Sequence, residues 1–187
     1  MADADVREAV PSDAEEIARI QLTTWRTAFT ELLPAAVLDE LDSAATEQEW
    51  RHALTDGPAA VLVATEGPWI VGFCAAGPAP EAEVAAANGT LPEDAATVAL
   101  VSALLVEPRW GRRGHGRRLL GAMVERLAAG GATRGITWVP EANTASMAFF
   151  RSAGWAPDGT VRTLDAGGRP LRELRLSGPM ELHFEER

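Results

Sequence analysis

The stretch LVSALLVEPRWGRRGHGRRLLGAMVERLAAG, residues 100–130, decides the fold of this chain. Its first part, residues 100–106, is almost continuously apolar, which is typical of a strand buried on both faces. Pro108 ends this strand because proline cannot donate a hydrogen bond to a ladder. After a turn rich in glycine and arginine, apolar residues recur at helical spacing from Leu119 to Leu127. The stretch therefore predicts a buried strand, a turn and an amphipathic helix that ends at Gly130.

The turn is a candidate anion site. Gly111, Gly114 and Gly116 allow a ligand to approach the backbone closely, because glycine has no side chain to stand in the way. The helix that follows adds unsatisfied N–H groups and the positive end of its dipole. Five arginines lie in residues 109–118, although the formal net charge of the chain is −10. This local cluster favours a specific anion and no nucleic-acid partner; the alternative is a solvated, arginine-rich helix start.

Composition limits the class of protein. With 187 residues, 47% of them hydrophobic and 24% charged, the chain is predicted to form a single domain over residues 1–187. No apolar run is long enough to span a membrane and no apolar signal segment opens the chain, so we expect a cytoplasmic protein with no membrane partner. Cys74 is the single cysteine and the three histidines are scattered, so we expect no metal site.

Elements outside the central stretch are predicted from three signals. Capping residues mark helix starts, alternating or β-branched apolar runs mark strands, and a segment rich in Ala, Pro, Glu and Gly marks a long loop. The order strand, helix, strand in the centre predicts a parallel pair within the sheet. The predicted elements are an edge strand at 6–9, helices from 12, 34 and 46, a β-hairpin at 59–64 and 69–75, a loop at 77–97, a strand at 135–139, a helix from 143, and a hairpin at 161–164 and 171–176.

Three motifs, in chain order, resemble the GNAT family of N-acetyltransferases. They match the family's opening strand and helix, its acyl-CoA pyrophosphate loop, and the strand–helix motif that follows. The ordered set covers nearly the whole chain and is more specific than the loop alone. The motifs are Val-Arg-Glu-Ala at 6–9 with Ser-Asp-Ala-Glu at 12–15, Val-Glu-Pro at 106–108 with Arg-Arg-Gly-His-Gly at 112–116, and Glu-Ala-Asn at 141–143 with Ser-Met-Ala-Phe-Phe at 146–150 and Gly-Trp at 154–155.

The resemblance implies an α+β fold: a GNAT-like single domain with a seven-stranded mixed sheet that is splayed into a V and flanked by about four helices. It also implies that acetyl-CoA lies in the V, with its pantetheine arm along the strand before the loop. A splayed strand exposes backbone donors and acceptors that an amide-bearing arm can satisfy. The strand that begins near Leu100 is therefore expected to pair only partly with its parallel neighbour.

The residues that the resemblance implies for acetyl-CoA come from the strand, the loop and the later helix. The pyrophosphate is expected on N–H groups of residues 112–117, where arginine side chains also hold its charge. A plain helix cap is an equal alternative for Asn143, and core packing is the alternative for both phenylalanines. The expected set is Leu104, Leu105, Val106, Arg112, Arg113, Gly114, His115, Gly116, Arg117, Asn143, Ser146, Phe149 and Phe150.

The sequence departs from the family pattern at positions that bear on binding and catalysis. Gly111 stands three residues before Gly114, where the family usually has Gln or Arg. Phe150 stands where many members have a tyrosine general acid, and this chain has no tyrosine. The region of Leu100 also lacks the carboxylate base that some members carry there.

The catalytic candidates are accordingly few. Glu141, close to the cofactor motif, is the candidate general base. Alternatives on the first helices are Glu31, Asp39 and Glu40. A backbone N–H of Leu105, or of Val106, is the candidate oxyanion donor.

One function is preferred and two alternatives are kept. The resemblance implies an enzyme, an acetyl-CoA-dependent N-acetyltransferase that moves an acetyl group to a primary amine of a small molecule or peptide by direct transfer. The missing tyrosine and carboxylate favour, as the alternative, a non-catalytic acyl-CoA-binding module of the same fold. An enzyme acting on nucleotide phosphates is disfavoured because the chain has no lysine for a phosphate loop. Trp25 and Phe29 are candidates for an apolar acceptor wall, with core packing as the alternative; a homodimer is an open possibility.

Overall fold

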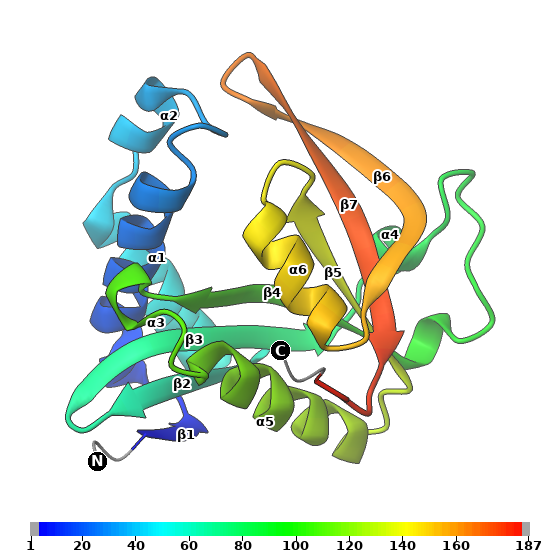
Figure 1. Cartoon of the computed structure of the whole chain (residues 1–187), viewed down its shortest axis with the longest axis horizontal. Coiled ribbons are helices and arrows are strands. Elements are labelled where there is room, and N and C mark those ends of the chain that lie inside the picture. Colours follow the sequence, from blue (N-terminus) through cyan, green and yellow to red (C-terminus); the bar gives the residue numbers. More distant parts are fainter. Residues whose placement is uncertain (1–3, 185–187) are drawn as a thin grey trace. The chain divides into compact units, whose positions relative to one another are not determined.

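The computed structural model describes residues 4–184, which contain six α-helices and seven strands (Figure 1). The strands form one sheet in the order β1-β2-β3-β4-β5-β7-β6. Contacts group these residues into two compact units, one made of residues 4–76 and 103–123 and the other of residues 77–102 and 124–184. None of the helices in the described part of the chain is both long and apolar enough to cross a membrane.

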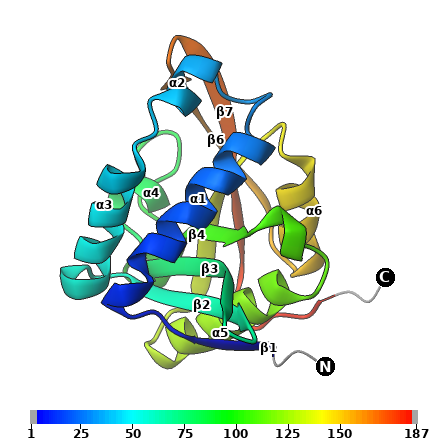
Figure 2. The ribbon, with the colours of Figure 1, turned by 90° about the vertical axis from the view of Figure 1, so that its left-hand side faces the viewer.

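The first unit is an antiparallel sheet covered by helices. Helices α1 and α3 lie side by side over one face of β2 and β3 (Figure 2). Ile17 and Ile20 of α1 pack there against Val63 and Phe73, which removes this apolar surface from water. The elements are β1 (Ala4–Glu8), α1 (Ala14–Ala28), α2 (Ala35–Asp39), α3 (Ser43–Asp56), β2 (Ala60–Glu66), most of β3 (Trp69–Pro78), the end of β4 (Val98–Val106) and the start of α5 (His115–Ala129).

The second unit is built on a long closing hairpin. Helix α6 lies on one face of its strands and α4 on the other (Figure 1). Trp155 is fully buried, and a Cβ added at Gly135 or Gly178 would come within 2.3 or 2.1 Å of its indole. Glycine at these positions therefore lets the indole pack directly on the backbone. The elements are α4 (Glu81–Val84), the start of β4, β5 (Arg134–Pro140), α6 (Thr144–Ser152), β6 (Ala156–Ala166) and β7 (Arg169–Pro179).

The predicted mixed sheet of seven strands is confirmed. The four helices of nine residues or more, α1, α3, α5 and α6, account for the number that the resemblance implies. The short helix α2 follows its cap Pro34, which confirms the short helix predicted there, and α4 is a short addition. In the second unit, β4 pairs with parallel β5 over Val98–Leu100 and Arg134–Ile136. Beyond this register the Thr137 hydroxyl donates to the Val101 carbonyl at 2.9 Å, which agrees with the expected partial pairing. A single domain over residues 1–187 stays a prediction.

Two local predictions were wrong. Helix α3 begins at Ser43 and not at Thr46, because the Asp42 carboxylate caps it by accepting from Ala44 N at 2.8 Å and Ala45 N at 3.3 Å. The segment 77–97 is not one long loop, since it contains the end of β3, helix α4 and a 3₁₀ turn.

Candidate functional site

The glycine- and arginine-rich turn lies between β4 and α5 in the first unit. A 3₁₀ turn at Pro108–Trp110 follows the strand. Arg112 has a φ of 62° and Gly114 a φ of 82°. A left-handed conformation is uncommon for a residue with a side chain, so the backbone at Arg112 is held in place by its surroundings. Gly114 takes this conformation without strain, and a Cβ there would have its nearest neighbour, the Arg118 guanidinium, 3.7 Å away.

The buried carboxylate of Glu107 ties this turn to helix α1. Glu107 is 6% exposed, accepts from Arg19 of α1 at 3.1 Å and pairs with Arg109 at 3.0 Å. Burial alone would raise the pKa of Glu107, but the hydrogen bonds and charges of the two arginines outweigh it and lower the pKa below its usual value. The carboxylate therefore stays charged and fixes the start of the turn.

A second carboxylate, Glu66 at the end of β2, holds the start of α5. It accepts from Arg113 at 2.8 Å and lies 2.8 Å from Nε2 of His115, which is 2% exposed. Burial opposes ionisation of Glu66, but these two partners outweigh it and lower its pKa. Arg118 lies 3.3 Å from Nδ1 of His115; because a guanidinium only donates, Nδ1 accepts and Nε2 donates to Glu66. Both ring nitrogens of His115 are thus used inside the protein. If this residue contacts a ligand, it does so through its backbone N–H.

The turn offers a ligand both charge and an unsatisfied donor. Arg112 is exposed, whereas Arg113 pairs with Glu66 and stacks 4.8 Å from the centre of the Trp110 ring. Within residues 4–184, the indole N–H of Trp110 is one of two buried side-chain polar groups with no hydrogen-bond partner. A buried donor without a partner is unfavourable, and an acceptor oxygen of a bound anion would satisfy it. The residues present therefore fit a diphosphate.

The predicted strand residues adjoin this turn. Leu105 packs against the core beneath α1 and α3. Gly72 of β3 approaches it so closely that a Cβ there would lie 2.7 Å from the Leu105 carbonyl oxygen. Leu104 and Val106 are half-buried, and Glu107 N donates to Val71 O at 2.9 Å. The first unit thus brings together the strand and loop residues of the predicted site.

The predicted residues of α6 lie in the second unit. The Asn143 side chain accepts from Ser146 N at 3.1 Å, so it caps this helix. Phe150 is 5% exposed and stacks on Trp155 with ring centres 5.6 Å apart, which makes it a core residue. Phe149 is half-buried and meets Phe150 edge-on at 5.3 Å. A cofactor role for these four residues stays a prediction.

The predicted acid–base and acceptor residues lie at the surface or half-buried. Glu141 is 51% exposed and pairs with Arg172 at 3.3 Å, so water competes with this contact. Trp25 and Phe29 are half-buried at the end of α1, with ring centres 6.1 Å apart. The alternative bases, Glu31, Asp39 and Glu40, are exposed.

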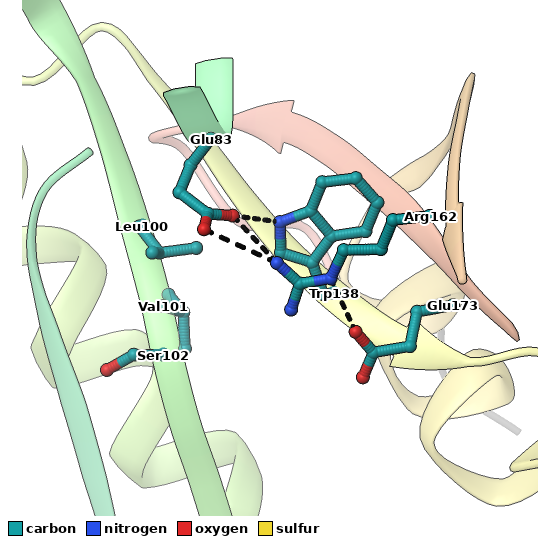
Figure 3. A pocket seen from close by; sticks show the side chains of 7 residues that line it. All are labelled: Glu83, Leu100, Val101, Ser102, Trp138, Arg162 and Glu173. Carbon is teal, nitrogen blue, oxygen red and sulfur yellow. Dashed lines mark hydrogen bonds and ion pairs between the residues drawn. The ribbon is translucent and has the colours of Figure 1, made fainter. Parts of the chain in front are cut away.

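The sequence reasoning missed a pocket in the second unit (Figure 3). Its volume is about 150 Å³, and two of its carboxylates, one arginine and one indole interact with one another. One signal was present: Arg162 and Glu173 lie equally far from the inner ends of the two predicted hairpin strands, 161–164 and 171–176, and they face each other across β6 and β7. The lining residues are Glu83, Leu100, Val101, Ser102, Trp138, Arg162 and Glu173.

The chain matches known proteins along most of its length. The model of the Acetyltransferase (GNAT) family matches residues 17–155. The uncharacterized N-acetyltransferase YuaI of Bacillus subtilis is 30% identical over 176 residues, which is 93% of this chain and 92% of that protein.

Solved structures have the same fold. The ribosomal-protein-alanine N-acetyltransferase of Brucella melitensis superposes with a TM-score of 0.69 at 22% identity, covering 94% of this chain and 99% of that chain. The yncA protein of Salmonella typhimurium, solved with its cofactor acetyl-CoA, gives a TM-score of 0.69 at 16% identity, covering 100% of this chain and 99% of that chain.

Proposed function

Because this chain belongs to the GNAT family of acetyltransferases, we propose that it transfers an acetyl group directly from acetyl-CoA to a primary amine of a small molecule or peptide. The family match over residues 17–155 carries the proposal. Acetyl-CoA, the cosubstrate, supplies an activated acetyl thioester. The protein's task is then to bind this donor, to hold the acceptor nitrogen nearby and to stabilise developing charge.

The donor site is proposed on β4 and on the turn that follows it. Backbone N–H groups of residues 112–117 and the start of α5 hold the diphosphate, and Arg112 and Arg117 add positive charge. The buried indole N–H of Trp110 is a further donor beside them. Residues 104–106 are assigned to the amide groups of the pantetheine arm. The left-handed backbone of Arg112 and Gly114 supports this assignment, because it gives the turn a bent backbone on which a diphosphate can lie close to the N–H groups.

Proton movement in this proposal depends on few groups. The Leu105 N–H is the proposed oxyanion donor, and Glu141 is the proposed acceptor of the proton that the amine loses. Phe150 cannot donate a proton, and the chain has no tyrosine to take its place. A CoA thiolate is a good leaving group, so transfer can proceed with proton delivery from water.

The donor site is tested with the variant Gly114→Val. We expect loss of CoA binding in calorimetry, because Val at a φ of 82° is strained and its methyl groups block approach to the backbone. Gly121→Val is the matched control, since a Cβ at Gly121 of α5 has no neighbour within 4 Å. If Gly114→Val binds CoA as tightly as the wild type, the diphosphate does not lie on this turn.

The second candidate function is a non-catalytic acyl-CoA-binding module. The observation that favours it is the buried, stacked position of Phe150, which leaves no acid at the usual place. Release of free CoA thiol from acetyl-CoA, measured over a panel of primary amines, separates the two candidates. Amine-dependent release supports the enzyme, whereas tight CoA binding without release on any amine supports the module.

A further inference from the structure

The pocket of the second unit lies on the face of the sheet that α4 covers. Side chains alternate along a strand, so Trp138 of β5 lies on the face opposite to that of Gly135, which packs on Trp155. Arg162 of β6 and Glu173 of β7 face each other in register, and Glu83 reaches the pocket from α4 (Figure 3). With β4, which supplies Leu100, Val101 and Ser102, five elements of one unit converge on this space.

The lining side chains hold one another in fixed positions. Glu83 accepts from the indole N–H of Trp138 at 2.5 Å and from Arg162 at 3.0 Å. Arg162 also donates to Glu173 at 2.6 Å and stacks 4.2 Å above the centre of the Trp138 ring. Such mutual contacts fix the rotamers before a ligand binds, which lowers the entropic cost of binding.

Charge in this cluster does not balance. Around the pocket lie the carboxylates of Glu83, Asp158 and Glu173 and the guanidinium groups of Arg162 and Arg175. Arg175 is 6% exposed and is used internally, since it donates to Asp158 and to three carbonyls at the end of α4. Three negative and two positive groups leave a formal charge of −1. Glu83 and Glu173 share the single guanidinium of Arg162, so their two negative charges are only partly compensated, and a bound cation would neutralise the remainder.

Glu173 is the carboxylate best placed to meet such a cation. It is 8% exposed, and one of its oxygens accepts from Arg162. Figure 3 shows that the other oxygen makes no hydrogen bond or ion pair to any other residue that lines the pocket. Arg162 already contacts two carboxylates, so an anionic ligand would have to displace them.

The remaining walls are partly apolar and limit size. Leu100 of β4, which packs near Val84 of α4, and the indole of Trp138 give the pocket hydrocarbon surface, and Val101 and Ser102 complete the lining. The volume of about 150 Å³ admits a group of roughly the size of benzene. Leu100 belongs to the last register pair with β5, Leu100 and Ile136, and Val101 follows directly.

We propose that this pocket binds the ammonium end of the acceptor amine. The carboxylate of Glu173, supported by Glu83, pairs with the ammonium group. Because Pro140 pairs with Glu173, the Glu141 side chain lies on the opposite face, so in this arrangement Glu173 takes the place of Glu141 as acceptor of the proton that the amine loses before transfer. Leu100 and the Trp138 ring contact the adjoining hydrocarbon, which is no larger than one ring. The assignment of this ligand as an acceptor rests on the proposed acetyl transfer, whereas its binding as a cation is measured without any turnover.

The probe for this site is benzylammonium, with benzyl alcohol and benzoate as its neutral and anionic counterparts. Binding is followed in the full-length protein through the indole N–H nuclear magnetic resonance signal of Trp138, which the variant Trp138→Phe identifies. We expect benzylammonium to shift this signal in a saturable way at millimolar concentration. We expect no comparable shift with benzyl alcohol or benzoate.

Two variants test the site by different means. Glu173→Gln keeps the shape but removes the charge, and is expected to weaken benzylammonium binding about tenfold or more. Leu100→Phe keeps the charges but fills the space, and is expected to abolish binding. Glu93→Gln, the same chemical change at an exposed carboxylate of the same unit, is the control and is expected to bind like the wild type.

Each outcome decides one of the two proposals. Preferential binding of benzoate, equal binding by Glu173→Gln, or no shift with benzylammonium overturns the ammonium pocket. If benzylammonium binds as expected and the acceptor assignment is correct, Glu173→Gln raises the KM of amines in the CoA-release assay while CoA affinity stays unchanged. Binding of benzylammonium without CoA release on any amine would instead overturn the proposed acetyl transfer and leave the cation site standing.

Discussion

At the scale of single residues, arginine supplies every strong cation in this chain. There is no lysine, so carboxylates that need a partner meet a planar guanidinium, which can donate two parallel hydrogen bonds. Arg7 contacts Asp13 in this way at 2.7 and 3.0 Å, and Arg134 contacts Asp94 at 2.7 and 2.8 Å. Because arginine is the only strong basic side chain available, the turn at 109–118 uses it both to pair with carboxylates, as Arg113 does with Glu66, and to offer charge to a ligand, as proposed for Arg112.

Asp13 gives a prediction on pH. The hydrogen bonds from Arg7 lower its pKa, burial opposes this, and a hydrogen bond from Val10 N at 2.8 Å adds to it. Because the pKa of Asp13 in the folded protein lies below its usual value of about 4, the stabilisation is present above about pH 4 and is lost as pH falls through the folded pKa. We therefore expect Asp13→Asn to lower the free energy of unfolding at pH 7 by about 1–3 kcal/mol.

The measurement for Asp13 is urea unfolding between neutral and strongly acidic pH. The difference between wild type and Asp13→Asn should shrink below about pH 4, where the wild-type carboxyl takes up its proton. Asp39→Asn, at an exposed residue of α2, is the control and should change little. A difference that stays constant over the whole range would contradict a stabilising role for the charge.

At the scale of elements, helix α3 shows how a cap decides where a helix begins. Asp42 accepts from the first free N–H groups of the helix, and its charge lies at the positive end of the dipole. We expect Asp42→Ala to cost about 0.5–2 kcal/mol of stability in thermal or urea unfolding. Asp56→Ala removes the same group from the opposite end of α3, where a negative charge is unfavourable, so stability should stay equal or rise slightly. Equal losses at both ends would show that the cap is not the cause.

Much of the element order was predictable because its signals are local. Apolar alternation, together with glycine or proline a few residues away, predicted both hairpins, β5 and the turn before α5. The start of α3 was misplaced because two capping signals compete, and Thr46 proves to lie inside the helix, where its hydroxyl donates to the Asp42 carbonyl. Helix α4 was missed because four residues carry no period, and Arg175, far along the chain, contacts its last carbonyls.

The candidate sites, too, were predicted where their residues are close in sequence and missed where they are far apart. The turn at 108–116 was found because its glycines and arginines are consecutive, but its anchor Glu66 was not, since it lies 49 residues before His115. The ammonium pocket needs Glu83, Trp138, Arg162 and Glu173 from four elements. Only the pair Arg162 and Glu173 follows from the hairpin register. Sequence periodicity says which face a residue takes, but not which distant segment covers that face.

At the scale of the whole molecule, two electrostatic effects on CoA binding oppose each other. The formal charge of −10 repels a polyanion, whereas the arginines of residues 109–118 attract it locally. Charges beyond a Debye length are screened, and this length falls from about 10 Å at 0.1 M to about 3 Å at 1 M salt. At 0.1 M salt the attraction between the nearby arginines and CoA therefore already outweighs repulsion by the distant acidic residues. Adding salt then mainly weakens this attraction.

We accordingly expect the Kd for CoA to rise several-fold between about 0.1 M and 1 M sodium chloride in calorimetry, because the local arginines outweigh the net charge of the chain. Arg112→Gln should both raise the Kd at low salt and reduce its salt dependence, since this exposed guanidinium is proposed to meet the diphosphate. Arg151→Gln removes an exposed arginine from α6 and should leave both unchanged. Tighter binding at high salt would mean that repulsion by the acidic chain prevails, and the arginines of the turn would then have no attractive role toward the donor.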